Sequence, residues 1–314
     1  MKTLKTLPWH PHGTYLYSLT QAPHDFYVLS LPGRPPGYGG RCGDLPWGDN
    51  VFDMPVDQVK EHQFDCIIFQ DDPQYLEDQH RYLTEAQRRL PRIYLEHDPP
   101  REHPTDMPHP VDDPDILLVH VTHFNALMWH SPRTPTRVIE HGVVVPAGVQ
   151  YSGELPRGLV VVNHLARRGR RLGGDIFLAA REQVPLDLAG MGAEDLGGLG
   201  EIRHAQLPAL AARYRFLFNP IRYTSMGLAV IEAMMIGMPV VGLATTEMAT
   251  AIENGVSGYV DTDPDKLVIR MRQLLESPQQ ARAMGIAARR RAMERFGIDR
   301  FVSDWNAALQ QVTE

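Results

Sequence analysis

The sequence is short of cysteine, of long apolar runs and of positive charge. Its two cysteines, Cys42 and Cys66, give no disulfide framework, so we expect a reduced, cytoplasmic protein. No apolar run approaches the length of a membrane span, and the N-terminus has no signal-peptide core. The net charge of −7 argues against a general nucleic-acid binder. We therefore expect no transmembrane segment and no nucleic-acid partner, while peripheral membrane contact stays open.

What is present is a chain of 314 residues with 43% apolar content, enough for one large or two medium domains. Short apolar runs that stop at Gly, Pro, Asn or Asp predict buried parallel strands alternating with helices. The predicted strands are 4–7, 26–31, 64–69, 92–95, 116–121, 137–140, 159–163, 186–189, 216–218 and a run from 240. The predicted helices are 15–19, 228–236, 265–276, 278–294 and 298–312, with a long loop at 33–49 and a linker at 146–156.

The most informative stretch runs from Arg215 to Gly242 and reads as strand, loop, helix, turn and strand. The helix from residue 228 to 236 is apolar at every position except Glu232, and a carboxylate in a buried helix needs a partner. Either Glu232 pairs with an Arg or Lys, or it faces a cleft and binds a ligand. Gly227 at the helix start offers free N–H groups to an anion. Phosphate on those groups and ribose on Glu232 would suit a nucleotide.

This stretch resembles the donor-site signature of the retaining GT-B glycosyltransferases of family 4, also called glycosyl transferase group 1. The residues that carry the resemblance are Pro220, Gly227, Leu228, Glu232, Ala233, Gly237, Pro239, Val240 and Val241. The family's first glutamate, which touches the donor sugar, is replaced by Thr224. A second motif, from residue 250 to 258, resembles the family's E-x-I-x-x-G-x-x-G with Thr250 in place of its glutamate.

The resemblance implies an α/β protein of the GT-B fold, in which two Rossmann-like domains face each other across a cleft and a C-terminal helix crosses back. We expect an acceptor-side domain at 1–146, a nucleotide-sugar domain at 147–296 and the returning helix at 297–314. The implied activity is metal-independent transfer of a sugar from a nucleotide sugar to an acceptor hydroxyl, with retention at the anomeric carbon. Two alternatives remain: a sugar-nucleotide-binding protein without transfer, and a GT-B epimerase or hydrolase.

The resemblance also implies which residues form the site. The expected catalytic residues are His97, Arg168, Thr224 and Glu232. The expected donor-binding residues are Gly13, His164, Arg168, Gly190, Arg203, Thr224, Ser225, Met226, Gly227, Leu228 and Glu232. Arg168-Gly169 matches the family's Lys-Gly pair after the first strand of the second domain, and the guanidinium keeps the charge needed for a phosphate.

No cofactor is expected beyond a nucleotide sugar as co-substrate, a UDP- or GDP-sugar. The acceptor could be a glycan, a lipid-linked glycan or a small molecule. The chain has 14 histidines, including His10, His12, His120 and His123, but neither cysteine stands at zinc-ligand spacing to them. No metal site is expected.

Overall fold

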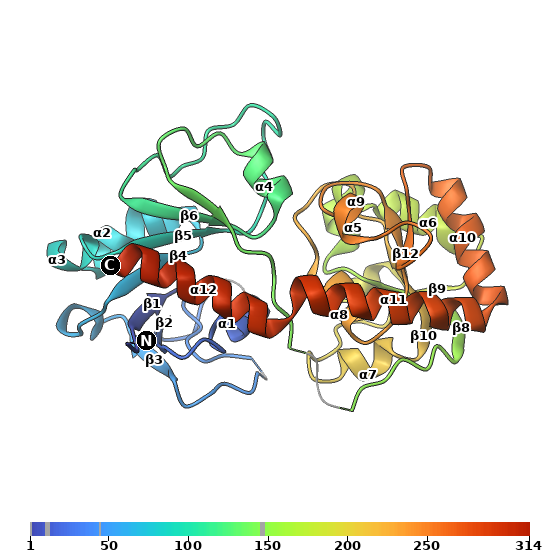
Figure 1. Ribbon diagram of the computed structural model, residues 1–314, viewed down its shortest axis with the longest axis horizontal. Coiled ribbons are helices and arrows are strands. Elements are labelled where there is room, and N and C mark those ends of the chain that lie inside the picture. The colour runs from blue at the N-terminus through green and yellow to red at the C-terminus, as the bar shows by residue number, and fades with distance from the viewer. Residues whose placement is uncertain (1, 10–12, 44, 145–147) are drawn as a thin grey trace. The chain divides into compact units, whose positions relative to one another are not determined.

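The computed structural model describes residues 2–9, 13–43, 45–144 and 148–314. The chain forms two compact units, one of residues up to 142 together with 298–314, the other of residues 143–297 (Figure 1). The predicted domain boundary between residues 146 and 147 falls outside the described residues, as do His10 and His12. Among the described residues, no helix is both long and apolar enough to cross a membrane.

The first unit is built on a seven-stranded sheet whose neighbouring strands all run parallel. In spatial order the strands are β3 (Val51–Pro55), β2 (Asp25–Ser30), β1 (Lys5–Pro8), β4 (Cys66–Phe69), β5 (Arg92–Glu96), β6 (Ile116–His120) and β7 (Thr136–Val138). The helices are α1 (Gly13–Leu19), α2 (Gln79–Tyr82), α3 (Glu85–Arg88), α4 (His123–Met128) and α12 (Ile298–Thr313), with a 3₁₀ turn η1 (Val59–Glu61) and a π turn η2 (Gln74–Asp78). The central strands are buried throughout, as near-continuous apolar runs require.

Helix α12 follows the second unit in sequence but packs on the first. Its apolar stripe, which includes Phe301 and Trp305, is fully buried, and Trp305 Nε1 donates to the hydroxyl of Tyr15 at 3.1 Å. Arg300 donates to the carbonyl oxygens of Glu140 and His141, which holds the start of the helix. The predicted return of the C-terminal helix to the first unit is therefore confirmed.

The second unit is built on a five-stranded parallel sheet. Its strands in spatial order are β12 (Gly258–Asp261), β11 (Val240–Leu243), β10 (Tyr214–Asn219), β8 (Leu155–Val161) and β9 (Leu186–Ala189). Its helices are α5 (Leu165–Arg168), α6 (Gly174–Arg181), α7 (Leu207–Ala211), α8 (Leu228–Met235), α9 (Met248–Ala251), α10 (Pro264–Glu276) and α11 (Pro278–Phe296), with 3₁₀ turns η3 (Gly169–Leu172) and η4 (Ala193–Leu196).

Most predicted strands and all five predicted helices are confirmed, one strand begins earlier than predicted, and two strands and several short helices were not predicted. Strand β8 begins at Leu155, inside the predicted linker, because Leu155 pairs with Tyr214 of the neighbouring strand. Strand β3 was not predicted, since it is an edge strand with two exposed residues in the middle and no clear alternation. Strand β12 was also not predicted, because it is only four residues long and begins at Gly258, the last residue of the glycine-containing motif.

Candidate functional site at the carboxyl edges of the two sheets

The order of strands in the second unit creates a switch point between β8 and β10. The chain runs from β8 to β9 on one side and then crosses to β10 on the other. In open parallel sheets, ligands bind outside the carboxyl ends of the strands at such a point. The two segments that leave it are the one after β8, with His164 and Arg168, and the one after β10, which leads into α8.

These two segments are in direct contact. The backbone N–H groups of Arg222 and Tyr223 donate to the carbonyl oxygen of Arg171, at 3.0 and 3.2 Å. Gly173 has a φ of +80°, and a Cβ there would lie 1.9 Å from the carbonyl oxygen of Pro220. Only glycine permits this approach, so the backbones of the two segments are held against each other.

An ion-pair cluster holds the segment after β10. Arg222 makes two charge-assisted hydrogen bonds to the carboxylate of Asp175 on α6, at 2.5 and 2.8 Å. Arg170 reaches the same carboxylate at 2.5 Å. The bonds from Arg222 lower the pKa of Asp175, so the carboxylate stays ionised. Of the predicted arginine cluster, Arg170 is therefore in this ion pair, while Arg168, at the end of α5, is half-buried.

The segments after β8 and β9 also meet. His164 adopts a left-handed backbone with a φ of +53°, which is uncommon for any residue other than glycine. Its N–H donates to the carbonyl of Met191 at 2.6 Å, and the N–H of Met191 donates to Asn163 Oδ1 at 2.9 Å. A Cβ at Gly190 would lie 2.6 Å from the carbonyl of Val162. The structure thus brings His164 and Gly190 to one place.

The start of α8 has room and unused polar groups. No side chain caps the helix at Gly227, whose φ is an ordinary −70°. A Cβ built on Gly227 meets no atom within 4 Å, so the packing of the protein itself does not require glycine there. Ser225 is 7% exposed, and its hydroxyl has no hydrogen-bond partner among the described residues. Buried hydroxyls are normally paired, so this one suits a bound ligand.

Glu232 lies on α8, one turn after its start, and its surroundings are apolar. The side chains around it include those of Leu217, Ala229 and Ile236. Burial raises the pKa of Glu232 to about 7. Among the described residues, no cation or hydrogen-bond donor pairs with its carboxylate, so the Arg or Lys partner that was one of two alternatives is not found. A carboxylate held in this way has its full hydrogen-bonding capacity available.

In the first unit, His97 follows β5 and its ring is held by a chain of hydrogen bonds. Its Nε2 lies 3.0 Å from Oε1 of Gln70, which follows β4. The Gln70 amide nitrogen donates to the carbonyl of Trp9, which follows β1, so the amide oxygen must face His97. An amide oxygen can only accept, and Nε2 of His97 therefore carries the proton. In the neutral ring Nδ1 is then an acceptor.

The turn that carries His97 is braced on both sides. Glu96 accepts from the N–H of Asp98 at 2.8 Å and from Nε2 of His109 at 3.0 Å. Trp129 Nε1 donates to the carbonyl of Asp98 at 2.8 Å. Burial raises the pKa of Glu96. A hollow of about 420 Å³ opens beside this turn, and its lining includes Gln70, Asp71, Asp72, Tyr94, His97, Arg101 and Trp129.

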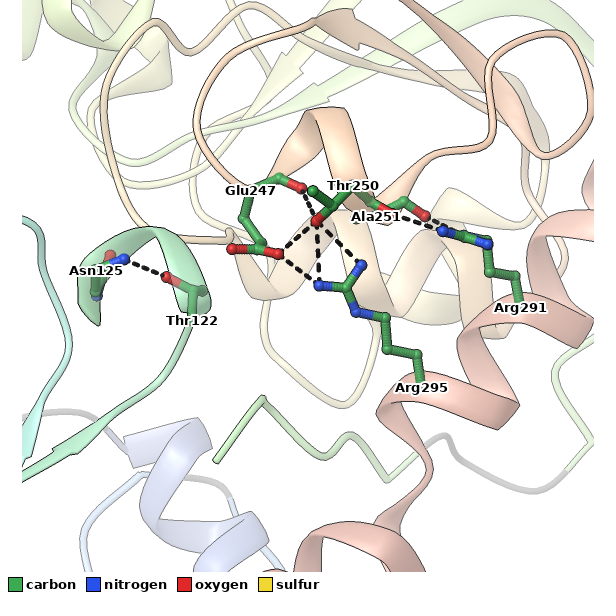
Figure 2. Close-up of polar contacts among 7 residues, drawn as sticks. All are labelled: Thr122, Asn125, Glu247, Thr250, Ala251, Arg291 and Arg295. Atoms are coloured by element: carbon green, nitrogen blue, oxygen red, sulfur yellow. Dashed lines mark hydrogen bonds and ion pairs between the residues drawn. The ribbon is translucent and has the colours of Figure 1, made fainter. Parts of the chain in front are cut away.

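Thr250 replaces the glutamate of the second motif, and its hydroxyl is engaged by two neighbouring side chains. Figure 2 shows Thr250 Oγ1 between Glu247 and Arg295: it donates to Glu247 Oε1 at 2.5 Å and accepts from Arg295 at 3.2 Å. Arg295 also pairs with Glu247 at 2.5 Å, and Glu247 is 3% exposed in its side chain. Arg291, one helical turn before Arg295, donates to the carbonyl oxygens of Thr250 and Ala251. This cluster ties α9 to α11.

The structure therefore places the predicted residues in groups. The carboxyl edge of the second sheet gathers His164, Arg168, Gly190, Thr224, Ser225, Met226, Gly227, Leu228 and Glu232. Arg203 lies between η4 and α7, and its side chain is exposed. Gly13 begins α1 and His97 follows β5, both at the carboxyl edge of the first sheet. Among the described residues, no group of three or more His, Cys, Asp or Glu side chains is placed to hold a metal ion.

Sequence reasoning missed several supporting residues, namely Gln70, Asp175, Arg222 and Thr122 with Asn125. Thr122 caps α4 by accepting from the N–H of Asn125 at 3.0 Å (Figure 2). The Asn125 amide is fully buried and has no partner among the described residues. The only signal in the sequence was the place of Gln70 at a strand end.

One family model is similar to part of the chain. Residues 179–277 match the family model described as glycosyl transferases group 1. No curated protein is a significant sequence match to the chain.

Solved structures match over almost the whole chain. Sucrose-phosphate synthase from Thermosynechococcus elongatus superposes with a TM-score of 0.72 at 17% identity, over 99% of each chain. HepE from Anabaena, in complex with UDP, gives 0.69 at 14% identity, over 99% of this chain and 100% of HepE. AviGT4, a glycosyltransferase involved in avilamycin A biosynthesis, gives 0.67 at 15% identity, over 99% and 98%. The predicted GT-B fold is confirmed by these superpositions, and within the second unit residues 179–277 are similar to the glycosyl transferases of group 1.

Proposed function

We propose that the chain transfers a glycosyl group from a nucleoside diphosphate sugar to an acceptor hydroxyl with retention, and that the donor lies at the carboxyl edge of the second sheet. The observation that carries this assignment is the unpaired carboxylate of Glu232 on an otherwise apolar helix. Ribose hydroxyls would give that carboxylate two donors and remove the cost of leaving it unsatisfied. The buried, unpaired hydroxyl of Ser225 supports the same location.

The diphosphate would lie between Arg168 and the start of α8. The first N–H groups of α8 have no side-chain cap and carry the positive end of the helix dipole. The open space at Gly227 admits a phosphate close to the backbone. Gly190 and His164, brought together after β8 and β9, would flank the nucleoside, and Arg203 would lie near its base.

The reaction breaks the bond between the anomeric carbon and the phosphate oxygen. The acceptor oxygen forms the new bond on the same face of the sugar, and its proton passes to the departing phosphate. Negative charge builds on the diphosphate as the bond breaks, and Arg168 with the α8 amides would stabilise it. Thr224 would contact the sugar and His97 would orient it. No side-chain nucleophile is assigned.

We favour a UDP-sugar over a GDP-sugar because HepE, which shares this fold, is seen with UDP. The acceptor is a molecule with a free hydroxyl group, of one of three classes: a glycan, a lipid-linked glycan or a small molecule. The cytoplasm is the compartment that fits best, since a chain with two cysteines in 314 residues gives no disulfide framework.

The test is calorimetry with UDP and GDP, followed by turnover with their sugars and assignment of the product anomer. Arg168→Ala should cost about 1.5–3 kcal/mol of nucleotide binding, the usual value of a charged hydrogen bond. Arg167→Ala, an exposed neighbour on the same short helix, is the matched control and should bind as the parent does. Equal affinities for the parent and Arg168→Ala would contradict the phosphate assignment.

A second candidate, a protein that binds sugar nucleotides without transfer, is favoured by one observation: Thr224 stands where the family has a sugar-binding glutamate. Binding of UDP with no turnover on a panel of UDP-sugars and acceptors would support it. Turnover without any acceptor would instead indicate an epimerase or hydrolase.

A further inference from the structure

The outward face of α11 carries a stripe of arginines and exposed apolar side chains. Arg282, Ile286, Arg289, Arg290 and Met293 follow one another at spacings of three or four residues, apart from the adjacent pair, so they share one side of the helix. Ile286 is 67% exposed and Met293 is 56% exposed. We call these five residues the α11 stripe.

The arginines of the stripe differ from the other two on the same helix. Arg291 and Arg295 point inward and are engaged by backbone carbonyls and by Glu247 (Figure 2). Arg282, Arg289 and Arg290 form no ion pair among the described residues, and only Arg282 touches a carbonyl, at 3.5 Å. Three uncompensated cations therefore lie together on a chain whose net charge is −7.

A groove runs beside the stripe. Its volume is about 740 Å³, and its apolar lining includes Val149, Tyr151 and Ile236 next to Ile286 and Met293. Glu294 is the one carboxylate among the described residues that line it. The surface thus combines apolar area with positive charge over the length of the helix.

We propose that the α11 stripe binds an anionic membrane surface, with Ile286 and Met293 entering the headgroup layer and the three arginines contacting lipid phosphates. A single exposed apolar side chain would be ordinary. Two such side chains on one side of a helix, two turns apart and flanked by arginines, form the pattern by which a helix lies in a membrane interface. A nucleic acid would satisfy the arginines but leave Ile286 and Met293 without an apolar partner. A membrane supplies both partners, and this face would orient an otherwise acidic protein on it.

The test is sedimentation of the full chain with vesicles of phosphatidylcholine alone and with vesicles in which a third of the lipid is phosphatidylglycerol. We expect binding to the anionic vesicles only, and weakening as salt rises. Each arginine near an anionic surface is worth about a fivefold change in partitioning, so replacing Arg282, Arg289 and Arg290 together by Gln should lower it about 100-fold. The double change Ile286→Ser with Met293→Ser should lower it by about tenfold or more.

The matched control is Ile269→Ser with Arg272→Gln on α10, which removes an exposed apolar side chain and an exposed arginine elsewhere on the same unit. Its partitioning onto the anionic vesicles should be at most about threefold weaker than that of the parent, because it loses one positive charge that lies away from the stripe. Thermal unfolding of every variant shows whether weaker binding comes from the altered surface or from a protein that no longer folds. Equal sedimentation with both vesicle types, or a stripe variant that binds as the parent does, would overturn the proposal. So would a stripe that holds two copies together, seen as a dimer in the parent and a monomer in the variants.

Discussion

Nε2 of His97 lies 3.0 Å from Oε1 of Gln70, and the Gln70 amide nitrogen is fixed by the carbonyl of Trp9. The three residues follow β5, β4 and β1, so the sheet order brings them together. Because Gln70 can only accept at this point, it acts as a positioning residue that keeps the His97 proton on Nε2.

Gln70→Glu should change the pH dependence of the reaction while leaving the fold of the protein intact. A carboxylate beside Nε2 favours the imidazolium, so the pKa of His97 should rise in the variant. Since the imidazolium lacks the Nδ1 acceptor, kcat/KM should fall at low pH and recover only above the raised pKa. The pH profile and the ring ¹⁵N shifts measure this.

The control for Gln70→Glu is Gln79→Glu, since Gln79 is also buried and also donates to a carbonyl, that of Tyr75. It should leave the pH profile unchanged. A profile for Gln70→Glu that matches the parent would mean that His97 takes no part in the step being measured.

Glu232→Gln should stabilise the free protein and weaken nucleotide binding. Burial raises the pKa of Glu232 from 4.5 to about 7 in the folded chain. The folded state then binds more protons than the unfolded state between those values, so stability falls as pH rises through this window. The stability of the parent has fallen by its full amount once the pH is above 7. A glutamine at this position has no charge to bury, so Glu232→Gln should raise the free energy of unfolding by about 2–3 kcal/mol at pH 8 and change it little at pH 4.

Urea unfolding of the parent and Glu232→Gln at both pH values measures the change in the free energy of unfolding. Calorimetry with UDP measures the cost to binding, which we expect at about 1–3 kcal/mol for the loss of a charged acceptor. A variant that is no more stable at pH 8, yet binds UDP normally, would show that Glu232 has a partner the ligand does not displace.

The residues that sequence alone can single out are those that are unusual among their immediate neighbours in the chain. An acid in an apolar helix and a glycine before it are visible without a fold, so the sequence alone can single out Glu232 and Gly227 as candidates. Gln70 and Trp9 are 61 residues apart, and Asp175 and Arg222 are 47 apart. Their pairing depends on which strands and helices become neighbours, and this information is not local. Strand order likewise decides where the switch point lies, although the strands themselves were mostly recognised from apolar runs.

Arg295→Ala should destabilise the second unit strongly. It would leave the carboxylate of Glu247, 3% exposed, without its cation, and breaking a buried pair costs about 3–5 kcal/mol. Adding Glu247→Gln should recover part of the loss, because no buried charge remains. Arg289→Ala on the same helix, which has no ion pair among the described residues, should change stability by less than about 0.5 kcal/mol. Equal unfolding midpoints for the two single variants would contradict the role of this cluster.

Turnover should survive excess EDTA. In the proposed site Arg168 and the α8 amides supply the positive charge that the leaving diphosphate needs. The measurement is the initial rate with and without EDTA. Loss of activity that Mn²⁺ or Mg²⁺ restores would show that these groups are insufficient.

Thr224→Glu tests the position at which the chain departs from the glycosyltransferase signature that it resembles. Thr224 is half-buried in the segment between β10 and α8, directly before the unpaired Ser225. A glutamate would offer a charged acceptor to two sugar hydroxyls, where threonine offers one neutral hydroxyl. Charge-assisted bonds are about twice as strong as neutral ones, so the present site should hold a common hexose less firmly by about 1–2 kcal/mol.

We expect the parent to turn over some sugar nucleotide, either one with an unusual hydroxyl pattern or a common one whose contact Ser225 or a water completes. Thr224→Glu should then shift the preference among donor sugars, measured as ratios of kcat/KM. Affinity for free UDP should stay within about threefold, or 0.7 kcal/mol, because the nucleotide does not touch residue 224. Thr224→Gln, which has the length of glutamate without its charge, should shift the preference less. If Thr224→Glu weakens free UDP as much as the sugar nucleotide, residue 224 faces the diphosphate, and the sugar must lie elsewhere along the edge of the sheet.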